Sequence, residues 1–244
     1  MGGRLKELQP HPLPELVTLG PFLLSIGFFY FPVVCLFSGG QMLNRTTCTS
    51  APGVIGALRD ATRLRHAHLG ASPAMSRLFD AGYTVPEYRT HLGLLLGFFE
   101  PLECAVSCAA EPGDPMLALE RSSALREDLT AMGATEIDIG ALERYHWASP
   151  IDPAGLFGYA YVILGSMMGG KIIVKRLRDI LGPAASFHFY GDREERCERL
   201  WASFCLNLEE NGKDNVEAIC ATAVVIFDAY ADWLSQPLLQ PGNC

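Results

Sequence analysis

The sequence predicts an all-α protein, and three observations support this fold class. Apolar residues recur at helical spacing along one face, as in Ala57, Leu58, Ala61 and Leu64. Helix-start signals recur along the chain, whereas no alternating apolar and polar run between hairpin turns indicates a strand. The 244 residues are enough for one domain with a sizeable core. We therefore expect a compact bundle of about seven or eight helices.

Caps and helix breakers divide the chain after residue 53 into successive helices. The first contains the apolar stripe of residues 57–64. The capping box Thr84-Val-Pro-Glu87, with proline just inside the start, opens a helix that we expect to end near Ala109. Four further helices begin at an aspartate, twice followed by proline. We expect them over residues 114–133, 152–181, 192–210 and 214–234.

The first fifty residues differ from the rest of the chain. No charged residue lies between Glu15 and Arg45, and this stretch is long enough for a membrane-spanning helix. Pro21 and Pro32 interrupt it, however, and the flanking basic residues are too few to orient it. A membrane anchor, a leader peptide and a translation start further downstream remain open alternatives. We treat residues 1–50 as a hydrophobic leader of undecided status, 51–236 as the domain and 237–244 as a tail. Membrane contact is expected only through residues 16–44.

Composition restricts the classes of partner and the compartment. The formal net charge of -8 argues against nucleic acid as the main partner, because binding phosphate backbones requires a basic surface. The eight cysteines include no Cys-x-x-Cys pair. We therefore expect reduced thiols in a cytoplasmic protein rather than a zinc site.

Two segments indicate the function. Leu58-Arg-Asp-Ala-Thr-Arg-Leu-Arg-His66 resembles the pattern L-[KR]-x-A-T-x-x-x-H, and Tyr161-Val-Ile-Leu-Gly-Ser-Met-Met-Gly-Gly170 resembles Y-V-x-x-G-S-x-x-G-G. These are the proximal-helix and distal-helix motifs of the heme oxygenase family, and they occur in the family's order. The resemblance covers roughly residues 55–235. Bacterial biliverdin-producing members are the most similar, including those that supply bilin to bacteriophytochromes.

The resemblance implies a heme oxygenase-like multi-helical bundle with heme between a proximal helix and a Gly-rich, kinked distal helix. His66 is the implied proximal iron ligand, because heme iron here needs an imidazole on one face and an open position for oxygen on the other. Without the motif, a lone helical histidine is more often a surface or core residue. His68 falls on nearly the opposite face of the helix, and we expect it to be exposed.

The distal motif implies a helix that passes close to the porphyrin. Gly165, Gly169 and Gly170 would allow this approach, although interior glycines cost a helix about 1 kcal/mol each relative to alanine. The alternative is a Gly-x-x-x-Gly contact between two packed helices. Ser166 stands where some members have aspartate, so we expect it to deliver protons together with ordered water. The two methionines that follow are expected to pack rather than to bind iron.

Three residues are expected to orient the heme propionates. Arg59 lies two turns before His66 and matches a basic position of the family, and Tyr161 or its neighbour Tyr159 would add a hydrogen bond. Arg199, with Arg196, lies on the helix where the family often supplies further propionate partners. A solvated helix face is the alternative for each arginine.

The sequence also departs from the family pattern. Gly70 replaces a glutamate that in many members supports the proximal histidine. Leu164 stands where close relatives often have glutamate. Glu198 and Ala202 replace the usual basic positions near Trp201. These departures leave open a protein that binds heme but turns it over poorly.

The resemblance implies oxidative cleavage of heme to biliverdin with release of CO and iron. The reaction would use O2 and electrons from an external reductase or ferredoxin, since no flavin or nicotinamide motif is present. One alternative is a non-catalytic heme-binding or heme-delivery protein. Another is a helical di-iron oxidase, for which Glu143-Arg-Tyr-His146 supplies one Glu-x-x-His motif of the two required.

Overall fold

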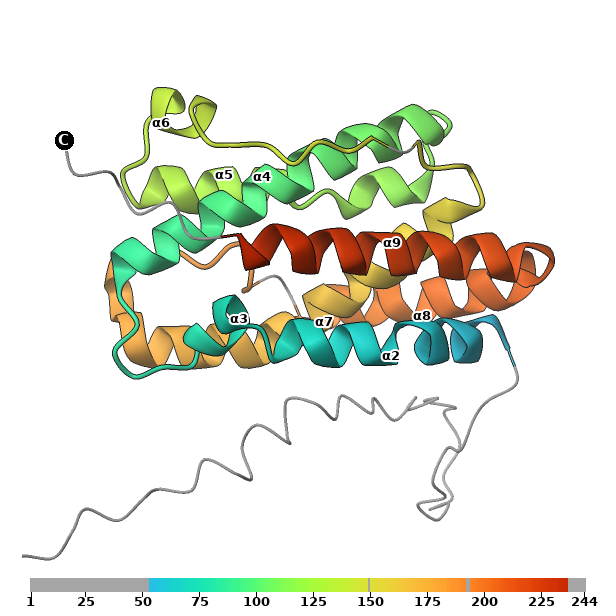
Figure 1. Ribbon diagram of the computed structural model, residues 1–244, viewed down its shortest axis with the longest axis horizontal. Coiled ribbons are helices and arrows are strands. Elements are labelled where there is room, and N and C mark those ends of the chain that lie inside the picture. The colour runs from blue at the N-terminus through green and yellow to red at the C-terminus, as the bar shows by residue number, and fades with distance from the viewer. Residues whose placement is uncertain (1–52, 149, 192–193, 237–244) are drawn as a thin grey trace, which may run out of the picture. The chain divides into compact units, whose positions relative to one another are not determined.

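The computed structural model describes residues 53–148, 150–191 and 194–236, and Figure 1 shows how their helices are arranged. The leader at 1–50 and the tail at 237–244, both expected from the sequence, lie outside these residues. The described part contains eight α-helices, three short 3-10 helices and no strand. The predicted all-α fold class is confirmed.

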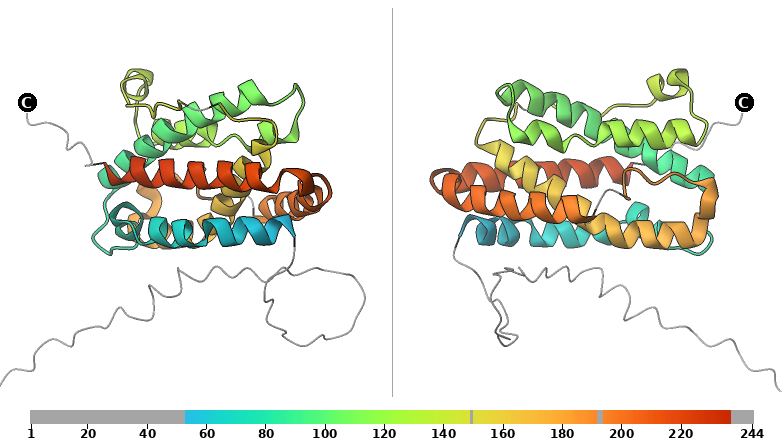
Figure 2. Two further views of the ribbon diagram at one scale, coloured as in Figure 1. Left: turned by 45° about the vertical axis from the view of Figure 1, so that its right-hand side comes forward. Right: turned by 180° about the vertical axis from the view of Figure 1, so that it is seen from behind.

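The elements follow one another along the chain, with a long connection at residues 141–154 between α6 and α7. The 3-10 helices are Pro115–Leu119, Gly182–Ala184 and Lys213–Asn215. The α-helices are α2 (Val54–Gly70), α3 (Pro73–Arg77), α4 (Val85–Ala109), α5 (Ser122–Ala131), α6 (Glu136–Gly140), α7 (Gly155–Leu181), α8 (Glu194–Asn211) and α9 (Val216–Ser235). The helix α9 packs against both α2 and α7, and α8 packs against α7 (Figure 1). The ribbon of α7 changes direction along its length, as both views in Figure 2 show.

Local sequence signals account for several helix boundaries. The backbone N–H of Thr84 donates to Glu87 at 2.9 Å, and the Thr84 hydroxyl accepts from the Glu87 backbone, so the predicted capping box starts α4. The carboxylate of Asp152 accepts a hydrogen bond from the Gly155 backbone at 2.7 Å and starts α7. Gly182 ends α7 with a φ of 61°, a conformation that favours glycine.

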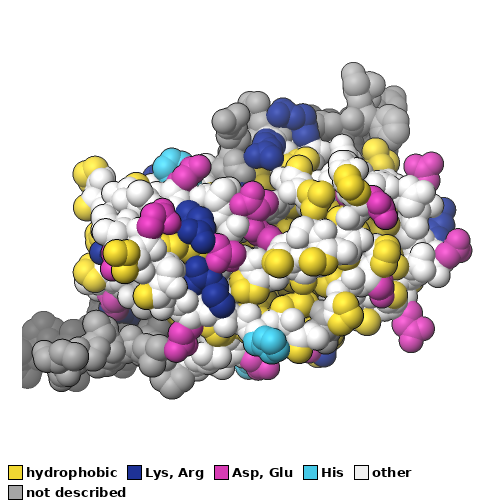
Figure 3. Space-filling model, turned by 90° about the horizontal axis from the view of Figure 1, so that it is seen from above, with side chains coloured by type: hydrophobic (Ala, Val, Ile, Leu, Met, Phe, Trp, Pro, Cys, Tyr) yellow, Lys and Arg dark blue, Asp and Glu magenta, His cyan; other side chains and the backbone are white. Residues whose placement is uncertain are grey.

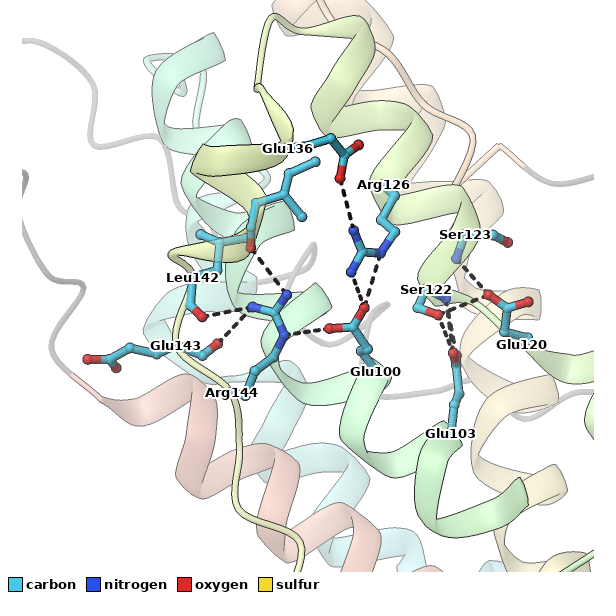
Figure 4. A network of polar contacts seen from close by, with 11 residues as sticks. Glu100, Glu103, Glu120, Ser122, Ser123, Arg126, Glu136, Leu142, Glu143 and Arg144 are labelled. Atoms are coloured by element: carbon cyan, nitrogen blue, oxygen red, sulfur yellow. Dashed lines mark hydrogen bonds and ion pairs between the residues drawn. The ribbon is translucent and has the colours of Figure 1, made fainter. Parts of the chain in front are cut away.

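The helix predicted over residues 114–133 is wrong as a single element. The structure has the 3-10 helix Pro115–Leu119, an extended residue at Glu120, and then α5. The reason is a tertiary contact. Glu103 of α4 accepts hydrogen bonds from the backbone N–H groups of Arg121 and Ser122, and these become the capped first amides of α5 (Figure 4).

Polar contacts connect α4 with α5 and with the segment after α6 (Figure 4). The carboxylate of Glu100 in α4 accepts from Arg126 at 3.0 Å and from Arg144 at 2.5 Å. Partly exposed pairs of this kind contribute little individually, but a shared carboxylate fixes three segments together. Seen from above, acidic and basic side chains are interspersed with apolar ones on this face (Figure 3).

The most apolar helices form the centre of the fold. Three segments, Val85–Ala109, Gly155–Ala184 and Lys213–Ser235, are long and apolar enough to cross a membrane by length and composition. About half of the most apolar stretch of the first two is buried inside the protein. Burial against the other helices therefore accounts for much of this hydropathy.

Candidate functional site

The helices α2 and α7 are linked by a partly buried hydrogen bond. The side chain of Thr62 is 2% exposed, and its hydroxyl lies 3.2 Å from the hydroxyl of Tyr161. Both helices run in the same general direction, as Figures 1 and 2 show. This contact identifies the face that each helix turns toward the other.

One helical turn further along, the two helices present different groups. Residues four apart lie on one face of a helix. His66 therefore lies on the face of α2 that carries Thr62, and Gly165 lies on the face of α7 that carries Tyr161. The two motifs that carry the family resemblance thus contribute an imidazole and a glycine to facing sides of neighbouring helices.

His66 is exposed, and its ring packs edge-on against Phe227 of α9 at a centroid distance of 6.0 Å. Partial removal of water lowers the pKa of His66, which favours the neutral form of the imidazole. No other residue in the described ranges hydrogen-bonds to this ring. A side chain at Gly70, one turn further on, would meet no atom within 4 Å of its Cβ.

His68 is exposed, as predicted, and belongs to a different feature. It lines a shallow groove of about 280 Å³ with Leu64 and Arg65 of α2 and three residues of α9, namely Phe227, Asp228 and Ala231. Phe227 borders this groove and also packs against the His66 ring, whereas His66 itself does not line the groove.

The glycines of α7 differ in the space that surrounds them. A Cβ at Gly165 or Gly169 would meet no atom within 4 Å. At Gly158, in contrast, a Cβ would lie 2.5 Å from the backbone oxygen of Ile219 in α9. The close packing of two helices that the sequence left as an alternative therefore occurs earlier in α7, whereas two of the three predicted distal glycines, Gly165 and Gly169, border open space.

The other residues of the distal motif have more restricted surroundings. A Cβ at Gly170 would lie 3.0 Å from the backbone oxygen of Tyr190, so this glycine allows the turn after α7 to fold back. Ser166 is exposed, and its hydroxyl donates to the Ile163 carbonyl at 2.8 Å. Met167 and Met168 are buried, which confirms that they pack in the core.

The expected propionate ligands lie in three settings. Arg59 is half-buried and has no hydrogen-bond or ion-pair partner within the described ranges. Burial raises the pKa of Tyr161, and its hydrogen bond with Thr62 and the positive charge of Arg59 oppose that shift. Arg199 is exposed on α8. The neighbouring Glu198, which replaces a basic residue of the family, forms an ion pair of 2.9 Å with Lys171 of α7.

The residues of the di-iron alternative are not gathered into a site. Glu143 and His146 are both exposed and lie between α6 and α7. Across residues 53–236, apart from the positions that the structure does not describe, no group of three or more His, Cys, Asp or Glu side chains could hold a metal ion.

Two contacts at the site were not predicted from the sequence. The carboxylate of Glu209 in α8 accepts from the backbone N–H groups of Val54 at 3.2 Å and Ile55 at 2.9 Å, and so caps the helix that carries His66. The hydrogen bond between Thr62 and Tyr161 is the second. Thr62 and Tyr161 both lie inside the two motifs, so the sequence held a signal for this hydrogen bond. No sequence pattern near Glu209 identified that residue as a helix cap.

Comparison with known proteins identifies the fold and the family of the chain. The fold resembles that of heme oxygenase-1 from the cyanobacterium Synechocystis sp. PCC6803, solved in complex with heme, with a TM-score of 0.56 and 16% sequence identity over 75% of this chain and 90% of that one. A search of curated protein sequences gives no significant match. The family model described as heme oxygenase matches residues 53–236, which is more than half of the chain. The chain therefore belongs to the heme oxygenase family.

Proposed function

We propose that this protein degrades heme to a biliverdin with release of CO and iron, using O2 and electrons from a separate donor. One observation carries the proposal. The exposed imidazole of His66 and the open, side-chain-free positions Gly165 and Gly169 follow the Thr62–Tyr161 contact by one or two turns, on the faces that meet there. Membership of the heme oxygenase family supports the same chemistry.

The residues present fit a heme group. A planar macrocycle bound through its iron needs one nitrogen donor on one side and room on the other. His66 supplies a neutral imidazole, since its pKa is lowered. Gly165 and Gly169 leave space where any Cβ would find no neighbour within 4 Å. Bound heme would supply the iron that activates oxygen.

The other residues bind and orient the substrate or handle protons. Arg59, whose positive charge acts on Tyr161 and has no ion-pair partner in the described ranges, would attract a propionate to this end of the site. Arg199 on α8 would provide a second cation. Ser166 donates its hydrogen to Ile163, so its free lone pairs can accept from water on the exposed face of α7. We propose that Ser166 orders the water that carries protons into the site.

Hemin binding followed by turnover tests the proposal. The purified protein mixed with hemin should develop the Soret band of a histidine-ligated heme, and a reductant in air should replace this band with bilin absorbance. In His66→Ala, the histidine-ligated spectrum and the turnover should both be lost. His68→Ala is the matched control, because His68 is an exposed histidine of the same helix outside the proximal motif, and its loss should leave both unchanged.

Other outcomes would point elsewhere. A Soret band that stays constant under reductant in air would favour the heme-delivery alternative. An unchanged spectrum in His66→Ala would reject the assignment of the iron ligand. Analysis of the isolated bilin identifies which meso carbon is cleaved.

A further inference from the structure

We propose that Thr62 and Tyr161 form a spacer that sets the separation of α2 and α7 and so positions His66 opposite the open face of α7. The inference rests on the proposed function, since it assigns a positioning role within that site. Neither residue is a proposed iron ligand. Their effect would reach the heme through the helices that carry His66 and Gly165.

The spacer is built from one buried side chain and one largely enclosed one. Thr62 is 2% exposed, and its hydroxyl donates to the Leu58 carbonyl at 2.7 Å. A threonine hydroxyl has a single hydrogen. Tyr161 must therefore be the donor in the contact of 3.2 Å between the two hydroxyls. A polar group of this kind is expensive to leave unpaired when buried, so the contact resists separation of the helices.

Other contacts hold α2 at different points. Glu209 caps its N-terminus from α8. Arg65 forms an ion pair of 2.8 Å with Asp228 of α9 on an exposed face. The Tyr161 ring packs near Trp201 of α8, with a centroid distance of 6.0 Å. The first two contacts fix where α2 lies on α8 and α9, whereas the Thr62–Tyr161 contact links α2 directly to α7.

The direction of this hydrogen bond changes the role of Tyr161. The sequence led us to expect that the Tyr161 hydroxyl would donate to a heme propionate. Its single hydrogen is directed to Thr62 instead, so in this arrangement it has none left for a carboxylate. The spacer and the propionate donor are therefore distinguishable roles. Loss of the Thr62 hydroxyl should weaken heme binding if Tyr161 acts through Thr62, but not if Tyr161 donates to a propionate.

The test compares Thr62→Val, Tyr161→Phe and the double variant with the wild type. The rate of hemin loss to an excess of a heme-scavenging apoprotein and the ratio of biliverdin isomers after turnover are measured. If the pair is a spacer, each single variant should raise the rate of hemin loss by about threefold to tenfold and broaden the isomer ratio. The double variant should be no worse than either single variant.

Controls separate the spacer from a general loss of stability. Thr62→Ser keeps the hydroxyl and should restore both readouts to wild-type values. Denaturant unfolding of the heme-free variants shows how much of any change reflects the fold. If Thr62→Val does not fold, Thr62→Ala takes its place in the comparison.

Two results would overturn the spacer. One is wild-type behaviour of Thr62→Val beside weakened binding in Tyr161→Phe, which would return Tyr161 to the role of propionate donor. The other is strictly additive effects in the double variant. Failure of the wild-type protein to bind hemin at all would reject the proposed function itself, so the two failures are distinguishable.

Discussion

Alanine at two glycines of the same helix should produce opposite changes in stability, and only one of the two substitutions should weaken heme binding. A Cβ at Gly165 would meet no atom within 4 Å. Gly165→Ala should therefore add the full helix propensity of alanine, about 1 kcal/mol in the free energy of unfolding of the heme-free protein. For a domain of this size, the thermal midpoint should rise by about 2–4 °C.

Gly158→Ala should have the reverse effect on stability. Its Cβ would lie 2.5 Å from the Ile219 oxygen and 2.9 Å from the Ala223 nitrogen, and these are backbone atoms that cannot rotate away. Overpacking costs about 1–3 kcal/mol. After the gain in helix propensity, a net loss of up to about 2 kcal/mol remains.

Urea unfolding of the two heme-free variants measures whether the free energy of unfolding rises or falls. Hemin titration measures the change in hemin affinity. Gly165→Ala should weaken hemin binding despite its greater stability, and Gly165→Leu should abolish binding. The folded fraction of Gly158→Ala should bind as the wild type does, because residue 158 packs against α9. Normal hemin affinity in Gly165→Leu would refute the reasoning, since a leucine cannot share that space with a porphyrin.

Three further predictions concern the surroundings of the site. Gly70→Glu should place a hydrogen-bond acceptor near His66 in open space and lower the reduction potential of bound heme; Gly70→Ala is the control in spectroelectrochemical titration. Glu209→Gln should destabilise the heme-free protein by about 1 kcal/mol, because two backbone amides of α2 lose a charged acceptor; urea unfolding measures this, and an unchanged midpoint would contradict the cap. Burial lowers the pKa of His91 from 6.5 to about 4, so protons favour the unfolded chain. Relative to His91→Gln, the free energy of unfolding should therefore be constant above pH 6.5, fall by on the order of 3 kcal/mol as the pH drops toward 4, and level off below that. Parallel pH curves for the two proteins would refute this assignment.

The parts of the fold that local sequence determines were predictable. The capping box at Thr84 and the aspartate at position 152 act through residues three positions away, so their signals are complete within a short window. The separation of Pro115–Leu119 from α5 was not predictable in this way. It depends on Glu103, a residue of another helix, which captures the amides of Arg121 and Ser122.

In the candidate site, too, some features could be predicted from the sequence and others depend on tertiary contacts. The motifs identify His66 and the glycines of α7 through resemblance to a family. They do not reveal that Gly165 borders open space whereas Gly158 contacts α9, because both are glycines in one helix. The direction of the hydrogen bond at Tyr161 likewise could not be predicted from the sequence, because it follows from the bond between the Thr62 hydroxyl and the Leu58 carbonyl. Such distinctions require the neighbours that tertiary structure supplies.

The capping of α2 by a residue of α8 has a consequence for how the protein is made. During synthesis, α2 leaves the ribosome early, but the Glu209 carboxylate and the surface of α9 on which α2 rests emerge near the end. A nascent chain that has reached residue 181 contains both motifs, yet it lacks the residues of α8 and α9 against which α2, the helix with His66, packs. The proposed heme site is therefore complete only once the last helix has been translated, and incomplete chains would lack it.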